Sequence, residues 1–252
     1  MSIKLLHLDV ETAPHIAYIW RLYDDYVPID RIVESGYTLC WAANWDHEKE
    51  VMFDSVHQSS QKKMVKGIRS LIDEADVVVH YNGKKFDTPV LQQEMLEQGL
   101  TPPAPFKQID LYHTVKQNFR FASNKLDYVA QKLGLGGKVK HKGMDLWKGC
   151  MAGNEADWRK MESYNKQDVR LLKALYHKLR PWIKNHPNLA LYVDDAKPRC
   201  PTCGSKNLQP NRGTAKLTSG LYMRYHCQDC GAWPRGSTNL LTPAKRKAML
   251  RT

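Results

Sequence analysis

Two carboxylates interrupt an apolar run near the start of the printed sequence, in the stretch KLLHLDVETAP at residues 4–14. Side chains alternate between the two faces of an extended strand, so Asp9 and Glu11 share one face and the neighbouring leucines and valine share the other. Two adjacent carboxylates repel each other and resist burial unless a positive charge offsets them. We therefore expect either a divalent cation with oxygen ligands or an Arg or Lys partner here.

The remainder of the N-terminal part alternates between strand-like and helix-like patterns. Strands are expected at residues 37–45, 50–56 and 76–82. Helices are expected at residues 60–75, 88–100, 123–135 and 154–182, the last as one or two helices. Strands that come first and then alternate with helices are typical of an α/β domain, which we expect to span residues 1–195.

The composition indicates a soluble, globular protein. The 252 residues are 42% hydrophobic and 25% charged. No apolar run approaches the roughly 20 residues that a membrane helix needs, so no membrane partner is expected. The N-terminus is too acidic, and its apolar length too short, for a signal peptide. We therefore expect a cytoplasmic protein.

The positive charge is concentrated at the C-terminus. The whole chain carries a net charge of +12, and residues 197–252 hold 11 Lys and Arg against one acid, Asp229. Residues 1–196 hold 27 basic against 25 acidic side chains. We expect the C-terminal surface to bind a polyanion, with a solvated basic tail as the alternative.

Four of the six cysteines form two C-x-x-C pairs that are separated by 23 residues. The pairs are Cys200 with Cys203 and Cys227 with Cys230. Each pair can wrap a tight turn around one ion, and Gly204 and Gly231 supply permissive backbone just after. Four thiolates make a closed tetrahedral site, so we expect one structural Zn²⁺ in a small basic zinc ribbon at residues 196–252. Cys40 and Cys150 match no such spacing and are expected in the core.

Two further sites add acidic groups to Asp9 and Glu11. HYNGKKFD places Asp87 just past the end of the strand expected at 76–82, where α/β domains commonly have functional groups. YNKQD places Tyr164 and Asp168 four residues apart on a helix, so their side chains face one way. Four carboxylates from three distant segments can converge on a pair of divalent cations.

These motifs, in this order, resemble a known enzyme family. D-x-E-T, N-x-x-x-F-D and Y-x-x-x-D are similar to the DEDD superfamily of 3′–5′ exonucleases, in the subgroup with a tyrosine in the last motif. FDTPVL and NKLDYVAQKLGLGGK are most similar to the proofreading exonuclease domains of family B DNA polymerases, here without a polymerase. The resemblance covers roughly residues 1–180 and implies an RNase H-like mixed sheet flanked by helices. The aromatic segment at 15–36 departs from the resemblance and is not mapped by it.

The resemblance also implies phosphodiester hydrolysis with two Mg²⁺ or Mn²⁺ ions. Asp9, Glu11 and Asp168 would hold the metal that generates the attacking hydroxide. Asp9 would bridge to the second metal, and Asp87 would act through a water of that metal. Tyr164 would orient the nucleophilic water through its hydroxyl without touching a cation. Two cations held by oxygen ligands are suited to this chemistry.

Residues outside the metal ligands are also assigned from the resemblance. The backbone of Thr12 and Ala13 would lie against the terminal nucleotide, and Asn82 and Phe86 would shape the substrate pocket. Other polar and aromatic residues are expected in structural roles. Asp110 is expected as a cap or structural acid and His7 as a semi-buried histidine, while core packing is favoured over base stacking for Trp20, Tyr23 and Tyr26.

The sequence thus predicts a 3′–5′ exonuclease that acts on DNA and prefers single-stranded 3′ ends, with the zinc ribbon aiding nucleic-acid binding. The same site acting on RNA is one alternative, because nothing selects for or against a 2′-hydroxyl. A transposase-like or resolvase-like nuclease is another, which Y-x-x-x-D disfavours. A non-catalytic nucleic-acid-binding protein is disfavoured because binding alone needs no carboxylate cluster. The ribbon could instead dock a replication or repair protein.

Overall fold

The structure is a computed structural model that describes residues 3–23, 26–218 and 220–250, so the outermost residues of both expected domains lie outside it. The chain forms two compact units. One comprises Lys4–Tyr176, and the other comprises His177–Thr252 together with Met1–Ile3. The domain boundary expected at residue 195 stays a prediction.

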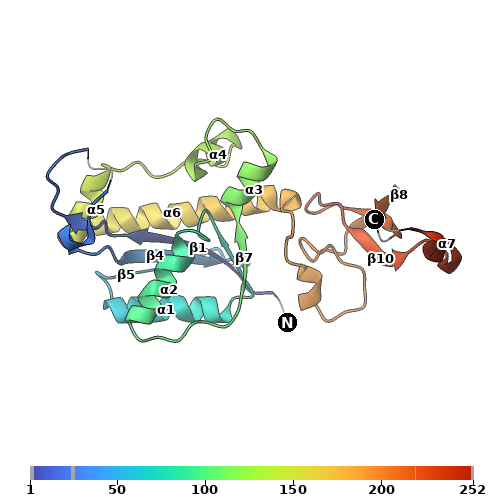
Figure 1. The fold of residues 1–252 in the computed structure, drawn as a ribbon, viewed down its shortest axis with the longest axis horizontal. Coiled ribbons are helices and arrows are strands. Elements are labelled where there is room, and N and C mark those ends of the chain that lie inside the picture. The colour runs from blue at the N-terminus through green and yellow to red at the C-terminus, as the bar shows by residue number, and fades with distance from the viewer. Residues whose placement is uncertain (1–2, 24–25, 219, 251–252) are drawn as a thin grey trace. The chain divides into compact units, whose positions relative to one another are not determined.

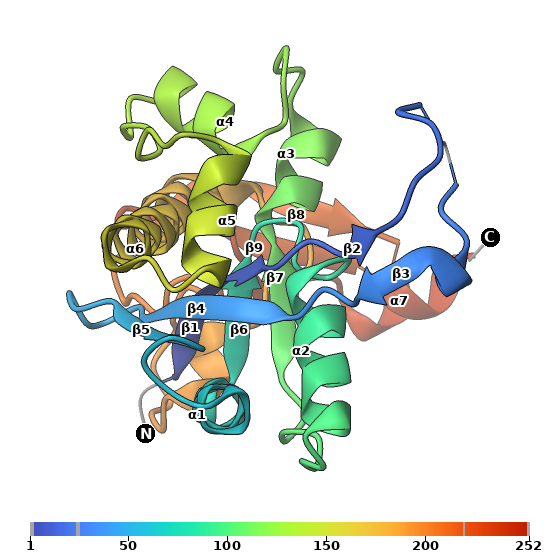
Figure 2. The ribbon, with the colours of Figure 1, turned by 90° about the vertical axis from the view of Figure 1, so that its left-hand side faces the viewer.

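A five-stranded mixed sheet forms the centre of the first unit (Figures 1 and 2). Its strands are β1 (Leu5–Thr12), β4 (Thr38–Trp45), β5 (Met52–Ser55), β6 (Val77–His80) and β7 (Lys107–Asp110). They lie in the order β5-β4-β1-β6-β7, in which β4 is antiparallel to both neighbours and β1, β6 and β7 are parallel. This is the RNase H-like α/β arrangement expected from the sequence.

Helices cover both faces of the sheet. The helices of this part of the chain are α1 (Gln61–Glu74), α2 (Asp87–Glu97), α3 (Leu111–Asn118), α4 (Leu126–Lys132), α5 (Met144–Met151) and α6 (Glu155–Leu179). α1 and α2 lie on one side of the sheet and the long helix α6 lies on the other (Figures 1 and 2). α6 is one continuous helix over the region where one or two were expected.

The alternation of β1 divides its side chains as the sequence predicts. Leu6, Leu8 and Val10 are buried in the core cluster that also contains Met64 and Ile68 of α1. Burial of each such side chain stabilises the fold by about 1.5–3 kcal/mol. Because a strand alternates, this packing directs Asp9 and Glu11 to the opposite face, toward α6.

The aromatic segment after β1 corrects one expectation. It forms a short hairpin of β2 (Ile16–Ala17) and β3 (Ile32–Glu34), with a 3₁₀ turn at Ile29–Arg31. Trp20, Tyr23 and Tyr26 are 86%, 94% and 76% exposed, so the expected core packing is wrong. Among the described residues the two short strands form a sheet of their own, and the three rings lie in the segment that connects them.

The second unit contains a three-stranded antiparallel sheet. Its elements are the 3₁₀ turns Arg180–Trp182 and Leu189–Tyr192, the strands β8 (Leu208–Leu217), β9 (Gly220–Cys227) and β10 (Arg235–Asn239), and the helix α7 (Pro243–Ala248). The strands lie in the order β10-β9-β8. Within the described ranges of the whole chain, no helix is long and apolar enough to cross a membrane.

Candidate functional site

Three of the predicted metal ligands converge. Asp9 and Glu11 project from β1 and Asp168 from α6, and each offers a carboxylate oxygen within 4.8 Å of the other two. The pairing of β1 with β4 shifts register between Glu11 and Thr12, which is the kind of irregularity that re-aims side chains beside functional sites. Two segments more than 150 residues apart in sequence therefore form one acidic cluster.

This acidic cluster is electrostatically unfavourable by itself. Burial raises the pKa of Asp9 well above its usual value, and the neighbouring carboxylates raise it further. Burial, followed by the charge of Asp168, raises the pKa of Glu11 to about 8. Asp168 Oδ1 is buried and, among the described residues, has no hydrogen-bond partner. Crowded oxygen donors with a spare lone pair fit a hard divalent cation such as Mg²⁺ or Mn²⁺.

Asp87 lies beside this cluster without joining the group of three. It is the first residue of α2, and its Oδ1 accepts a hydrogen bond from the Val10 backbone N–H at 3.0 Å. Burial raises the pKa of Asp87 to about 7. The structure therefore fixes Asp87 against β1, one residue from Asp9, where it adds to the local negative charge.

Lys138 is the functional candidate that sequence reasoning missed. Its ammonium group pairs with Asp168 Oδ2 and donates to Tyr164 Oη at 3.1 Å. Burial disfavours the charge of Lys138, but the charges of Asp168, Tyr164 and Asp9 and the hydrogen bond to Asp168 together outweigh it and raise the pKa of the lysine. The lysine partner considered for the acidic strand thus exists, although it pairs with the third carboxylate. Its sequence signals are the basic run KVKHK and its place as the last residue of NKLDYVAQKLGLGGK.

α6 contributes two further side chains next to Asp168. Tyr164 is buried, and burial together with the nearby carboxylates raises the pKa of its hydroxyl. Asn165 is fully buried, and its Nδ2 donates to Asp9 Oδ2 at 2.7 Å. Asn165 was not predicted, although its position three residues before Asp168 places it on a similar face of the helix.

A cavity of about 660 Å³ opens beside the acidic cluster. It is lined by Asp9, Tyr81, Asn82, Tyr112, Asn124, Lys125, Leu126, Asp127 and Lys138. Of the four predicted substrate contacts, the structure brings Asn82 to this cavity together with Asp9. Ala13 uses its backbone N–H inside the protein, donating to Tyr37 O at 2.8 Å, and Phe86 is 43% exposed. Thr12 ends β1 next to Glu11.

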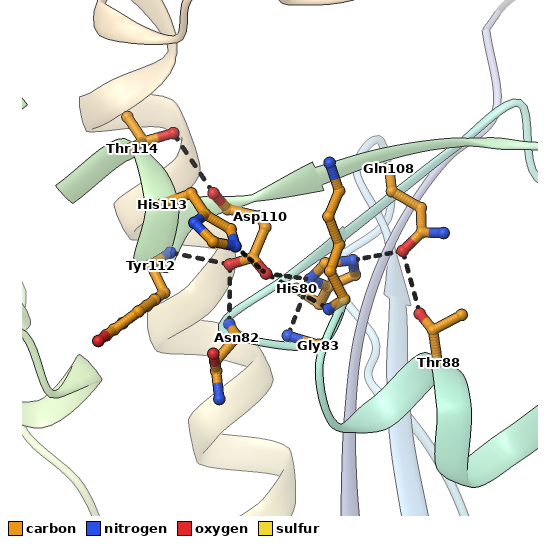
Figure 3. A network of polar contacts seen from close by, with 10 residues as sticks. His80, Asn82, Gly83, Thr88, Gln108, Asp110, Tyr112, His113 and Thr114 are labelled. Atoms are coloured by element: carbon orange, nitrogen blue, oxygen red, sulfur yellow. Dashed lines mark hydrogen bonds and ion pairs between the residues drawn. The ribbon is translucent and has the colours of Figure 1, made fainter. Parts of the chain in front are cut away.

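A polar network holds Asn82 at the cavity (Figure 3). Asp110 accepts from the backbone N–H groups of Asn82 at 2.8 Å and Tyr112 at 3.0 Å, and so caps α3 as expected for a structural acid. Asn82 has φ +66°, a left-handed conformation that asparagine tolerates. A Cβ at Gly83 would lie 2.5 Å from the His80 ring, so only glycine fits there.

The four cysteines of the second unit also come together. Their sulfur atoms lie within 4.8 Å of one another, with Cys200 to Cys230 and Cys203 to Cys227 each at 3.6 Å. Four Zn–S bonds of about 2.3 Å place sulfurs about 3.8 Å apart in a tetrahedron. Gly204 and Gly231 have φ of +73° and +77°, the left-handed turns expected after each pair. The cluster is compatible with a zinc ribbon.

Comparison with known proteins agrees with the fold. A family model described as the RNase H superfamily matches residues 36–180, which is more than half of the 252 residues. The chain belongs to the RNase H superfamily. The superfamily match contains Asp87, Tyr164 and Asp168 and begins after β1. A nuclease fold of this kind implies a nucleic-acid substrate and divalent metals.

Comparison with solved structures agrees with the same fold. The chain is similar to the family B DNA polymerase from the hyperthermophilic archaeon Pyrobaculum calidifontis, with a TM-score of 0.54 and 20% sequence identity. The match covers 72% of this chain and 25% of the polymerase chain, so this chain spans about a quarter of that protein. At this identity the likeness concerns the fold, and it confirms the fold that the sequence motifs implied. A comparison with curated proteins finds no match.

Proposed function

We propose that this protein is a metal-dependent 3′–5′ exonuclease that hydrolyses DNA and prefers single-stranded 3′ ends. The observation that carries the proposal is the convergence of Asp9, Glu11 and Asp168, with Tyr164 one helical turn from Asp168, at the edge of a cavity on an RNase H superfamily fold. The 3′–5′ direction rests on the resemblance of the three motifs to exonucleases of that polarity.

The acidic cluster would hold two Mg²⁺ or Mn²⁺ ions. Asp9, Glu11 and Asp168 would ligate one, and Asp9 would be shared with the second, which Asp87 would approach through water. When bound, such ions lower the pKa of a water and neutralise charge on the leaving oxygen. The fixed carboxylates orient this chemistry, since Asn165 and the Val10 amide hold Asp9 and Asp87 in place.

Tyr164 and Lys138 act on protons and charge around this centre. Lys138 donates to the Tyr164 hydroxyl, which leaves the hydroxyl proton free to point at a water or at Asp168. The same ammonium offsets the charge of Asp168. Tyr164 therefore orients the nucleophilic water, and Lys138 sets the direction of the tyrosine hydroxyl.

Replacing Tyr164 with Phe tests this role. Loss of one charge-assisted hydrogen bond of about 1.5–3 kcal/mol predicts a fall in kcat of about tenfold to a hundredfold. The affinity for Mn²⁺, measured by titration calorimetry, should stay within about twofold because the hydroxyl touches no cation in this scheme. A variant that loses Mn²⁺ affinity yet turns over normally at saturating metal would contradict the assignment.

Digestion of end-labelled single-stranded and duplex DNA and RNA, with and without Mg²⁺, tests the whole proposal. Stepwise loss of 3′ nucleotides from single-stranded DNA, only with the metal, is the expected result. Preferred digestion of RNA would point to an exoribonuclease with the same site. Binding without cleavage of any substrate would point to a non-catalytic nucleic-acid-binding protein.

In this scheme the three-stranded sheet of the second unit provides a surface that binds nucleic acid. Arg224 of β9 pairs in register with Arg235 of β10, and the Arg235 guanidinium lies 4.7 Å from the Tyr222 ring centre. His226 stacks on Trp233 with ring centres 4.3 Å apart, and Trp233 is 57% exposed. The exposed ring of Trp233 suits stacking with a base, and the exposed Arg224 and Arg235 suit contact with phosphates.

Replacing Arg224 and Arg235 together with Ala should weaken binding of a long single strand. Each lost phosphate contact removes about 0.7 from the slope of log affinity against log salt, so the slope should fall by about 1.4. The matched control replaces Lys245 and Lys247 of α7, which removes the same charge elsewhere in the unit. Equal slopes for the arginine variant and the wild type would favour docking of a replication or repair protein instead.

A further inference from the structure

A second cavity, of about 470 Å³, is distinct from the cavity beside the acidic cluster and is basic. It is lined by Lys140, His141, Lys142, Leu146, Asp157 and Lys160. The first three belong to the loop that also carries Lys138, and the last two belong to α6. None of these six residues lines the cavity that contains Asp9.

The basic cavity is connected to the acidic cluster along α6. Lys160, Tyr164 and Asp168 are spaced by four residues and therefore form one stripe on the helix. The ring of His141 lies 4.9 Å from the ring of Tyr164. At 1.5 Å of rise per residue, Lys160 is about 12 Å along the helix axis from Asp168. The buried Tyr164 therefore lies between Lys160 and Asp168 along this stripe of α6.

The charges in the basic cavity are not balanced. Lys142 pairs with Asp157 at 3.0 Å, which accounts for the single carboxylate. Lys140 and Lys160 form no ion pair with any residue that the structure describes. Two ammonium groups without an ion-pair partner, the exposed Lys140 and the half-buried Lys160, therefore line one cavity, and a bound anion would compensate their charge.

We propose that the basic cavity binds a backbone phosphate of the substrate strand, away from the scissile bond. This rests on the proposed exonuclease function. The axial distance of about 12 Å corresponds to about three phosphates at the 3.4 Å spacing of a stacked strand, and fewer on an extended one. Lys140 and Lys160 bind the phosphate oxygens, and His141 links the phosphate site to Tyr164. The cavity thereby makes turnover depend on the length of the strand.

The test compares substrates that can and cannot reach the cavity. The p-nitrophenyl ester of thymidine 5′-monophosphate has one phosphodiester, whereas a single-stranded hexanucleotide has several. Replacing Lys140 and Lys160 with Ala should lower kcat/KM for the hexanucleotide by about tenfold to a hundredfold and for the ester by less than about twofold. Arg159→Ala is the matched control for Lys160→Ala measured alone, because each removes one positive charge and Arg159 is exposed, adjacent to Lys160 on α6 and outside the cavity.

A binding arm keeps this test separate from the test of function. Affinity of the labelled hexanucleotide is measured in EDTA across a salt series, where no hydrolysis is needed. The double variant should lose affinity and about 0.7 of slope per lost contact. If the wild type hydrolyses neither substrate, the exonuclease proposal fails. The binding measurement alone then shows whether the cavity binds a phosphate of the strand.

Three outcomes would overturn the proposed phosphate site. The first is equal loss of kcat/KM on the ester and the hexanucleotide, which would assign the lysines to the chemistry at the acidic cluster. The second is an equal effect of Arg159→Ala and Lys160→Ala, which would mean that net charge alone acts. The third is a double variant that binds the hexanucleotide as tightly as the wild type but binds inorganic phosphate less tightly. That result would indicate a site for free phosphate.

Discussion

Replacing Asp9 or Asp168 with Ala is expected to lower Mg²⁺-dependent nucleotide release by at least about a thousandfold, because each removes a fixed oxygen donor from the centre where charge develops. The two residues come from different elements, β1 and α6. Together with Glu11 they form the group of three, and among the described residues no fourth carboxylate joins this group to replace either of them. Release of labelled nucleotides from a single-stranded oligonucleotide measures the effect.

The same variants should bind the oligonucleotide at least as well as the wild type. Each substitution removes negative charge next to a polyanion, so affinity in EDTA should hold or rise. Asp145→Ala is the control, since Asp145 is an exposed acid in the first turn of α5 outside the cluster, and its activity should be unchanged. Undiminished nucleotide release by both the Asp9 and the Asp168 variants would contradict the catalytic assignment.

The acidic cluster should also affect stability in the absence of divalent metal. The pKa of Glu11 rises from 4.5 to about 8 in the folded chain, first through burial. The folded state therefore binds more protons than the unfolded state between these values, and the free energy of unfolding falls as the pH rises from about 4.5 to about 8. Glu11→Gln should flatten this dependence in urea titrations with EDTA. If the variant keeps the wild-type slope of unfolding free energy against pH, groups other than Glu11 cause the pH dependence.

Local patterns in the sequence were sufficient for the parts of the site that lie on regular elements. The alternation of β1 separates Leu8 from Asp9 because one face must be buried, and helical spacing puts Tyr164 and Asp168 together on α6. Asp110 was recognised as structural, and it caps α3. In each case the spacing within one element decides where the side chain points.

The parts that sequence reasoning missed depend on contacts between distant elements. Lys138 reaches Asp168 from a loop 30 residues away, and no spacing rule encodes that approach. The aromatic content around Trp20 suggests burial, since such rings are buried on average. Whether a ring is covered depends on what packs against it, and the sheet of the β2–β3 hairpin has no third strand in the part of the chain that the structure describes.

Cys200→Ser is expected to remove the zinc from the second unit and to unfold its sheet. Cys200 is fully buried at the centre of a small apolar cluster with Cys227 and Ala232, so the sulfur atoms make up much of the core of this unit. Small modules of this type depend on about 10–16 kcal/mol of metal-binding free energy to fold. Serine offers a poorer ligand, and the remaining three thiolates cannot close the tetrahedron.

Metal analysis and hydrogen exchange together check the Cys200 prediction. The wild type, purified without chelator, should contain one zinc per chain, and Cys200→Ser should contain much less. Amides of β8, β9 and β10 should lose protection in the variant, while those of β1, β4 and α6 keep it because the five-stranded sheet has its own core. Cys150→Ala is the control, since Cys150 is buried in that other core and should leave the zinc content unchanged. Wild-type protein without zinc would refute the metal assignment, whereas loss of protection in both units would show that they fold as one cooperative structure.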